Sequence, residues 1–262
     1  MKKNREKIIF FGNGLLAEYS LAILEQTFEV VFHAKRKEDL EKIKEIKTKH
    51  PEIHGILASF GVIIPSSVLE IFDPEGILNI HPSLLPLYRG ASPIESAILN
   101  GDTGFSVSVM KLVREMDAGP IYWQTTLADL PLNKREIYKA LAEEGVKWIC
   151  DNLKNLPKPE LQDETKATFT KKLDKTMSLL SPENDTADEL LRKIVAFQDY
   201  PKPKYAFFGK ICTILDAHML KMGEEAFLTL KGSDEQILAI DEVQPEGRKS
   251  MDAKSFVNGY GK

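Results

Sequence analysis

Alternating apolar and polar stretches divide the first 80 residues into short strands and helices. Runs of consecutive apolar residues predict buried strands at four places: residues 7–11, 30–33, 53–60 and 77–80. Between them, apolar residues recur every three or four positions and predict three helices: residues 15–26, 36–49 and 65–71. Strands that alternate with helices predict a mainly parallel sheet joined by right-handed crossovers.

A second group of elements follows a proline-rich loop. Residues 93–100 predict a helix, and residues 105–110 alternate as a strand does. Residues 121–125 are expected to form a second strand that pairs antiparallel with the first. A long helix is predicted over residues 134–153, with Asn133 as its N-cap.

The last hundred residues have a different pattern. Residues from about 160 to 180 have few large apolar side chains in any period, which predicts a linker. After it, one helix is predicted over residues 187–197, followed by three short strands: residues 210–215, 226–230 and 236–243. One helix with several short strands predicts a small barrel. We therefore expect domains at residues 1–160 and 181–262, joined by a linker at residues 161–180.

Composition supports a globular chain of one large or two modest domains. Of the 262 residues, 43% are hydrophobic, which is enough for a sizeable core, and the 28% that are charged are normal for a soluble protein. No apolar run approaches the roughly 20 residues that span a membrane. The segment Met1-Lys2-Lys3-Asn4-Arg5 leads directly into a strand, without the cleavage region of a signal peptide. Cys150 and Cys212 form no CxxC pair, so we expect a reduced, cytoplasmic protein.

Three polar residues carry the candidate chemistry. Asn79 and His81 alternate around Ile80 at the end of an apolar strand, so their side chains point the same way. Asp117 precedes Ala-Gly-Pro at a turn between two strands. Separately, each feature is also ordinary turn chemistry. Together they supply two groups that stabilise an oxyanion and one proton acceptor, which acyl transfer to an amine requires.

These residues lie in motifs that resemble the folate-dependent formyltransferases. The matching runs are Asn79-Ile80-His81-Pro82-Ser83-Leu84-Leu85-Pro86 with Arg89-Gly90, and Asp117-Ala118-Gly119-Pro120-Ile121. Five further segments are similar to the same family: residues 59–65, 91–94, 166–169, 191–201 and 243–251. The last two resemble the branch that formylates methionyl-tRNA. The resemblance implies a Rossmann-like, mainly parallel α/β sheet followed by a small C-terminal β-barrel of the oligonucleotide-binding (OB-like) type.

The resemblance also implies the reactants and the roles of individual residues. The donor would be 10-formyltetrahydrofolate and the acceptor initiator methionyl-tRNA, and neither a metal nor a covalent enzyme intermediate is needed. Asn79 and His81 would hold the oxyanion, while Asp117 would accept the proton of the amine and help to keep His81 charged. The family pattern places the folate against nine residues: Phe60, Gly61, Val62, Ile63, Ile64, Ser83, Leu84, Leu85 and Pro86.

Two departures from the tRNA-modifying branch keep a second acceptor open. That branch usually has a basic insertion after the second strand, whereas here residues 32–38 run almost directly into a helix. Residues 181–262 contain eleven Lys and Arg against fourteen Asp and Glu, a net charge of −3. Nucleic-acid-binding domains normally carry a basic surface. The alternative acceptor is a small amine, such as a nucleotide-linked amino sugar.

Two further hypotheses concern anionic ligands. The spacing Gly12-x-Gly14-x-x-Ala17 fits a loose dinucleotide fingerprint, so a non-enzymatic module that binds NADP or folate is a third alternative. Arg89 lies within the main motif, where its guanidinium could bind an anionic tail or a phosphate.

Overall fold

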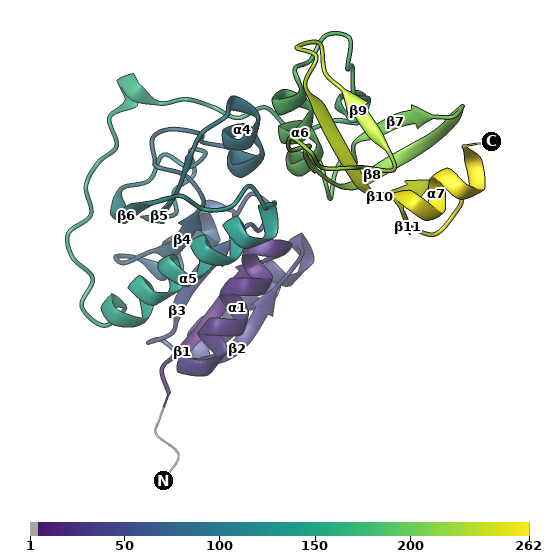
Figure 1. The fold of residues 1–262 in the computed structure, drawn as a ribbon. Helices are drawn as coiled ribbons and strands as arrows, with labels where there is room; N and C mark the ends of the chain where they lie inside the picture. The colour runs from purple at the N-terminus through teal and green to yellow at the C-terminus, as the bar shows by residue number, and fades with distance from the viewer. Residues whose placement is uncertain (1–4, 262) are drawn as a thin grey trace. The chain divides into compact units, whose positions relative to one another are not determined.

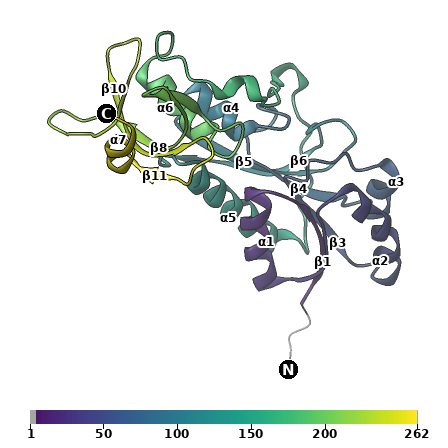
Figure 2. The same ribbon diagram turned by 90° about the vertical axis from the view of Figure 1, so that its right-hand side faces the viewer.

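The computed structural model describes residues 5–261 (Figures 1 and 2). Residues 1–4 and 262 lie outside the described residues, and so does most of the N-terminal segment discussed above. The chain forms two compact units, one of residues 5–94 and 103–171, the other of residues 95–102 and 172–261. The domain limits expected at residues 160 and 181 stay predictions.

A six-stranded sheet forms the centre of the first unit, in the order β2-β1-β3-β4-β5-β6. Its strands are β1 (Lys7–Gly12), β2 (Glu29–Ala34), β3 (His54–Ala58), β4 (Ile77–His81), β5 (Gly104–Lys111) and β6 (Ile121–Ala128). The first four strands pair in parallel, while β5 and β6 are antiparallel additions beside β4. The mainly parallel α/β sheet predicted from the sequence is therefore confirmed.

Helices cover both faces of this sheet. The helices α1 (Leu15–Thr27) and α5 (Lys134–Asn152) lie on one face, and α2 (Ile43–Lys49) and α3 (Ser66–Leu69) lie on the other (Figure 2). The helix α4 (Pro93–Asn100) follows the proline-rich loop. Apolar side chains from the strands and from the α2 and α3 side form a continuous buried cluster that includes Phe11, Ile43, Leu57, Phe60, Val68 and Phe72.

Two predicted helices are shorter than expected. The first begins as a 3-10 turn, Lys37–Lys42, and becomes α-helical only at Ile43. The Asp39 carboxylate accepts hydrogen bonds from the backbone N–H groups of Lys35 and Arg36, which satisfies donors at the start of this tight turn. The second, α3, ends at Leu69 and continues as a 3-10 turn, Glu70–Phe72.

The second unit is a curled antiparallel sheet with two helices. Its elements are α6 (Ala187–Ala196), β7 (Lys204–Phe207), β8 (Lys210–Met219), β9 (Thr229–Lys231), β10 (Ile237–Pro245), β11 (Met251–Asp252) and α7 (Ala253–Tyr260). The strands pair in the order β11-β10-β8-β7, with β9 on β10. Leu190 and Ile194 of α6 pack against Ile214, Ile240 and Phe256. The predicted small C-terminal β domain is confirmed, although β7, β11 and α7 were not predicted.

Within residues 5–261, no helix combines the length and the apolar character needed to cross a membrane.

A histidine between two carboxylates should make the stability of the second unit depend on pH. His218 Nδ1 lies 2.6 Å from Asp241 Oδ2, and its Nε2 lies 2.9 Å from Glu224 Oε1. These hydrogen bonds, the Asp241 one first, raise the pKa of His218 above its ordinary value. A raised pKa stabilises the fold below the ordinary value near 6.5, and this stabilisation disappears as the pH rises through the raised pKa.

We therefore expect the variant His218→Ala to lose more stability relative to the wild type at pH 6 than at pH 9. The difference should be small, because 42% of the side chain is exposed and solvent screens the charges. Urea unfolding of both proteins at the two pH values measures it. An equal loss at both pH values would show that the two carboxylates do not stabilise the charged imidazole.

Candidate active site

The central strand β4 presents Asn79 and His81 on one face of the sheet. Both residues are buried, with 4% and 5% of their surface exposed. Ile80 lies between them and faces α5, where it lies close to Gly145. Because side chains alternate along a strand, Asn79 and His81 point to the opposite side, as the sequence pattern predicts.

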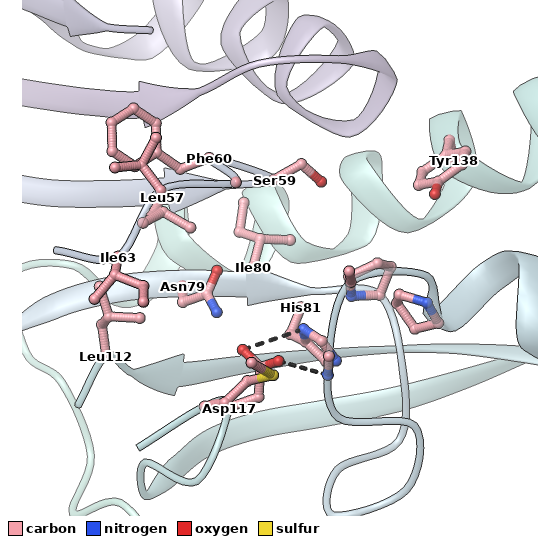
Figure 3. Close-up of a pocket in the computed structure, with 17 residues that line it drawn as sticks. Leu57, Ser59, Phe60, Ile63, Asn79, Ile80, His81, Leu112, Asp117 and Tyr138 are labelled. Atoms are coloured by element: carbon pink, nitrogen blue, oxygen red, sulfur yellow. Dashed lines mark hydrogen bonds and ion pairs between the residues drawn. The ribbon is translucent and has the colours of Figure 1, made fainter. Parts of the chain in front are cut away.

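At this end of β4 lies a pocket of about 420 Å³, within the usual size range of small-molecule sites (Figure 3). Segments from three connections form its wall: the loop after β3, the loop after β4 and the connection between β5 and β6. Most of the lining is apolar, with Leu57, Phe60, Val62, Ile63, Ile80, Leu112 and Met116. Asn79, His81 and Asp117 all reach this one pocket. The structure thus brings together the three residues selected from the sequence.

Asp117 enters the pocket from a strained position. Its backbone φ is +50°, in the left-handed region that few residues other than glycine, Asn and Asp adopt. Its Oδ2 accepts a 2.8 Å hydrogen bond from the backbone N–H of Gly90. Its Oδ1 lies 3.7 Å from His81 Nδ1, which is too long for a hydrogen bond but close enough for a charge interaction (Figure 3). Catalytic contacts often tighten only when the substrate binds.

The tautomer of His81 follows from its other nitrogen. Nε2 lies 3.2 Å from the backbone carbonyl oxygen of Tyr88. A carbonyl oxygen only accepts, so Nε2 carries the hydrogen and donates it. Nδ1 is therefore the nitrogen that faces Asp117, and the hydrogen bond through Nε2 sets the orientation of the ring.

The Asn79 side chain is a buried polar group without an internal partner. Among residues 5–261, no group forms a hydrogen bond with its amide, which faces the pocket (Figure 3). Among residues 5–261, the fully buried side-chain atoms without a partner are Ser20 Oγ and Arg192 Nε, so the Asn79 amide is not sealed in the core but stays accessible through the pocket. A ligand atom in the pocket would supply the missing partner.

The nine residues expected to contact folate separate into two groups. Phe60, Gly61, Val62 and Ile63 line the pocket, whereas Ile64 lies in the core. Ser83, Leu84, Leu85 and Pro86 lie outside the lining. In that loop, Ser83 Oγ donates to the Leu87 carbonyl, and Leu85 is buried. A folate contact of these four residues and of Ile64 stays a prediction.

The hypothesis that Arg89 binds an anionic ligand is wrong. Only 3% of its side chain is exposed, and its guanidinium donates two hydrogen bonds to Glu164, at 2.7 and 2.8 Å. It also donates to Gln162 Oε1. The Glu164 carboxylate accepts these bonds, which lowers its pKa. Arg89 is thus already neutralised inside the protein.

Sequence reasoning missed several residues of the pocket. Gly90 and Ala91 lie inside segments that resemble the family, and Leu112 and Met116 lie close to the Asp117 motif, so position in or beside these motifs was the available signal. Tyr138 comes from α5, and only the three-dimensional structure brings it to the pocket. Among residues 5–261, no group of three or more His, Cys, Asp or Glu side chains could hold a metal ion.

Gly119 is the residue whose replacement should most disturb the turn that carries Asp117. A Cβ at this position would collide with the backbone carbonyl oxygen of Lys111. The strands β5 and β6 would have to separate there, so we expect Gly119→Ala to cost about 1–3 kcal/mol of unfolding free energy.

Urea denaturation of Gly119→Ala measures this cost, and Gly259→Ala in α7 is the matched control. A Cβ at Gly259 meets open space, and alanine favours a helix by about 0.5–1 kcal/mol over glycine. The control should therefore be neutral or slightly stabilising. Equal midpoints for Gly119→Ala and the wild type would show that the turn can relax.

Two family models match the chain. The formyl transferase model matches residues 12–153, and the model of the formyl transferase C-terminal domain matches residues 172–261. The methionyl-tRNA formyltransferase of Dehalococcoides mccartyi (strain BAV1) is 32% identical over 259 residues, covering 94% of this chain and 79% of the relative. That of Campylobacter lari is 33% identical over 252 residues, covering 90% and 80%.

Solved structures share the fold at lower identity. The methionyl-tRNA formyltransferase from Clostridium thermocellum superposes with a TM-score of 0.68 at 20% identity, covering 92% of this chain and 98% of that chain. HypX from Aquifex aeolicus in complex with tetrahydrofolic acid gives 0.72 at 17% identity. This chain spans about half of HypX, 48% of its length, while 99% of this chain is covered. From the two matched models and the curated relatives, we conclude that the chain belongs to the formyl transferase family and is an enzyme.

Proposed function

We propose that this enzyme transfers a formyl group from 10-formyltetrahydrofolate to the amino group of initiator methionyl-tRNA. The unpartnered amide of Asn79, beside His81 and Asp117 in one pocket, is the observation that carries the proposal. Its curated relatives are named methionyl-tRNA formyltransferases. The folate-bound structure of HypX, which shares the fold, supports the donor.

The pocket suits a folate. Flat heterocycles bind in concave, mainly apolar sites that contain a few convergent polar groups. Leu57, Phe60 and Val62 supply an apolar wall, and Ile63, with 83% of its surface exposed, offers apolar surface at the rim. The formyl folate supplies an activated formyl carbon when it is bound. The loop from Ser83 to Pro86 would support this wall.

Asn79 and His81 would stabilise the charge that develops on the formyl oxygen. The Asn79 Nδ2 group has no competing partner, so it can donate a hydrogen bond without breaking an existing one. Because His81 Nε2 donates to the Tyr88 carbonyl, Nδ1 would donate to the formyl oxygen only as part of a doubly protonated imidazolium, which the proposal requires. Donors held in place before the reaction pay no reorganisation cost during it.

Asp117 would act as the proton acceptor. Its carboxylate lies beside His81 and is oriented by the Gly90 N–H. As the amine nitrogen bonds to the formyl carbon, its proton would pass to Asp117, directly or through a water molecule. The bond from the formyl carbon to the folate nitrogen then breaks, and that nitrogen takes up a proton.

The relatives and the C-terminal unit support methionyl-tRNA as the acceptor. The chain matches the C-terminal formyl transferase model over residues 172–261, and its curated relatives carry the name of the tRNA enzyme. The net charge of −3 over residues 181–262 means that any tRNA contact would use local basic clusters rather than a uniformly basic surface. The proposal includes a cytoplasmic location, where translation begins.

An acceptor assay tests this proposal. The purified protein is incubated with 10-formyltetrahydrofolate and either charged initiator methionyl-tRNA or a nucleotide-linked amino sugar, and the formamide product is measured. We expect formylmethionyl-tRNA, with a steep loss of rate at higher salt because phosphate contacts release counterions. Transfer to the amino sugar alone would make the acceptor a small amine and would contradict the tRNA proposal.

A further inference from the structure

A segment predicted to be only a linker holds the candidate active site in place. We call residues 160–170 the strap, because they run across the loop that follows β4. At its start, Glu160 and Ile121 of β6 exchange two backbone hydrogen bonds. Near its end, Phe169 forms a parallel bridge with Arg89 of that loop.

We infer that Gln162 of the strap is a positioning residue that holds Asp117 in its reactive orientation, an inference that rests on the proposed function. Gln162 Nε2 donates to the backbone carbonyl oxygens of Asp117 at 2.8 Å and of Gly119 at 2.7 Å. Its Oε1 accepts from Arg89 Nε and Nη2 at 3.1 and 2.7 Å. The carbonyl groups require donors and the guanidinium requires an acceptor, so only one orientation of the amide fits.

Asp117 needs such support because its backbone is strained. A non-glycine residue at positive φ persists only where its surroundings hold it there. Gln162 holds the carbonyl of Asp117, and the Gly90 N–H holds its carboxylate. With both ends fixed, the carboxylate faces His81.

Arg89 and Glu164 fix Gln162 in turn. The guanidinium of Arg89 is buried and lies between Gln162 Oε1 and the Glu164 carboxylate. Its charge is neutralised there, and hydrogen bonds to charged groups are stronger than neutral ones. Gln162 is therefore half-buried and lies at the centre of a short network that joins the buried Arg89 to the turn of Asp117.

The strap also fixes the two loop groups that touch the candidate catalytic residues. Thr168 Oγ1 accepts from the Tyr88 N–H at 2.8 Å, and the Thr168 carbonyl accepts from the Arg89 N–H at 2.9 Å. Tyr88 provides the carbonyl that His81 binds, and Gly90 provides the N–H that binds Asp117. One segment thus controls the orientation of both His81 and Asp117.

The test compares Gln162→Glu and Gln162→Ala with the wild type. A glutamate keeps an oxygen acceptor for Arg89, which also keeps it ionised, but it loses the two N–H donors to Asp117 and Gly119. We expect kcat for formyl transfer to fall by about 10- to 100-fold in both variants, because small displacements of a reacting group have effects of this size. KM for the folate should change less than about threefold, since Gln162 does not line the pocket.

Leu161→Ser is the matched control, because the neighbouring side chain is 88% exposed and should leave kcat unchanged. The variant Asp117→Asn supplies a second control. In that background, Gln162→Glu should cause little further loss, because Gln162 acts through Asp117. A full additional loss there, or wild-type kcat in Gln162→Glu, would overturn the inference.

A crystal structure of Gln162→Glu separates this inference from the proposed function. The Asp117 carboxylate should move away from the 3.7 Å contact with His81. An unmoved carboxylate overturns the inference whatever the acceptor is. Failure of the wild type to formylate methionyl-tRNA would instead refute the proposed function and would leave this structural result valid.

Discussion

Asp117→Asn should lower kcat by about 100- to 10,000-fold, the range that positioned acid–base groups contribute. The amide that replaces the carboxylate cannot accept a proton from the amine at neutral pH. It also removes the negative charge beside His81. Single-turnover formyl transfer measures the effect without interference from product release.

The substitution should leave the fold intact, which makes the result informative. Asparagine tolerates the left-handed φ of this position, and its oxygen can still accept from the Gly90 N–H. Thermal unfolding should therefore stay close to that of the wild type. A folded Asp117→Asn protein with a rate within threefold of wild type would remove this carboxylate from the mechanism.

Asn79→Ala should lower kcat by about 100- to 1,000-fold, as the loss of one preorganised oxyanion donor does elsewhere. The effect on stability should be small. The amide has no hydrogen-bond partner among residues 5–261, so its removal leaves no internal group unsatisfied. A large fall in kcat with a small loss of stability would show that the Asn79 amide serves the bound ligand rather than the fold.

The matched control is Asn155→Ala, which removes an exposed asparagine outside the pocket. Both variants are compared by kcat and by melting temperature under the same conditions. Asn155→Ala should behave as the wild type does. If Asn79→Ala is equally active, or if its loss follows a collapse of stability, the donor role of Asn79 is refuted.

Local sequence patterns predicted the elements that can be recognised from their own residues alone. Apolar residues identify β4 because it lies inside the sheet and helices cover both faces, so all five of its residues are buried. Alternation around Ile80 placed Asn79 and His81 on one face because the period of a strand is two. The cap at Asn133 also matches the structure, where its side chain accepts from Arg135 and Glu136.

Other elements depend on contacts that no local pattern encodes. The helix α7 contains Ser255, Asn258 and Gly259, which favour a helix only weakly. It is stabilised by the burial of Phe256 in the core, and Asp252 supplied the one local signal as its N-cap. The strand β7 has only four residues at the edge of its sheet, too few for a clear alternation.

The strap at the candidate site is a further segment whose structure local sequence patterns do not predict. Its side chains are mostly polar, so a periodicity argument reads it as a linker. Its structure comes instead from hydrogen bonds to residues more than 40 positions away, such as those between Gln162 and Asp117. The sequence motif made Arg89 a candidate for anion binding. Its actual partner, Glu164, could not be recognised from the sequence because it lies 75 residues further along the chain.

The most direct measurement of the central claim is formyl transfer by the wild type and by His81→Ala, assayed side by side. Both proteins receive saturating 10-formyltetrahydrofolate and charged methionyl-tRNA, and formylmethionyl-tRNA is counted over a single turnover. We predict rapid transfer by the wild type and a rate at least about 100-fold lower for the folded variant. Equal rates for the two proteins would contradict the account.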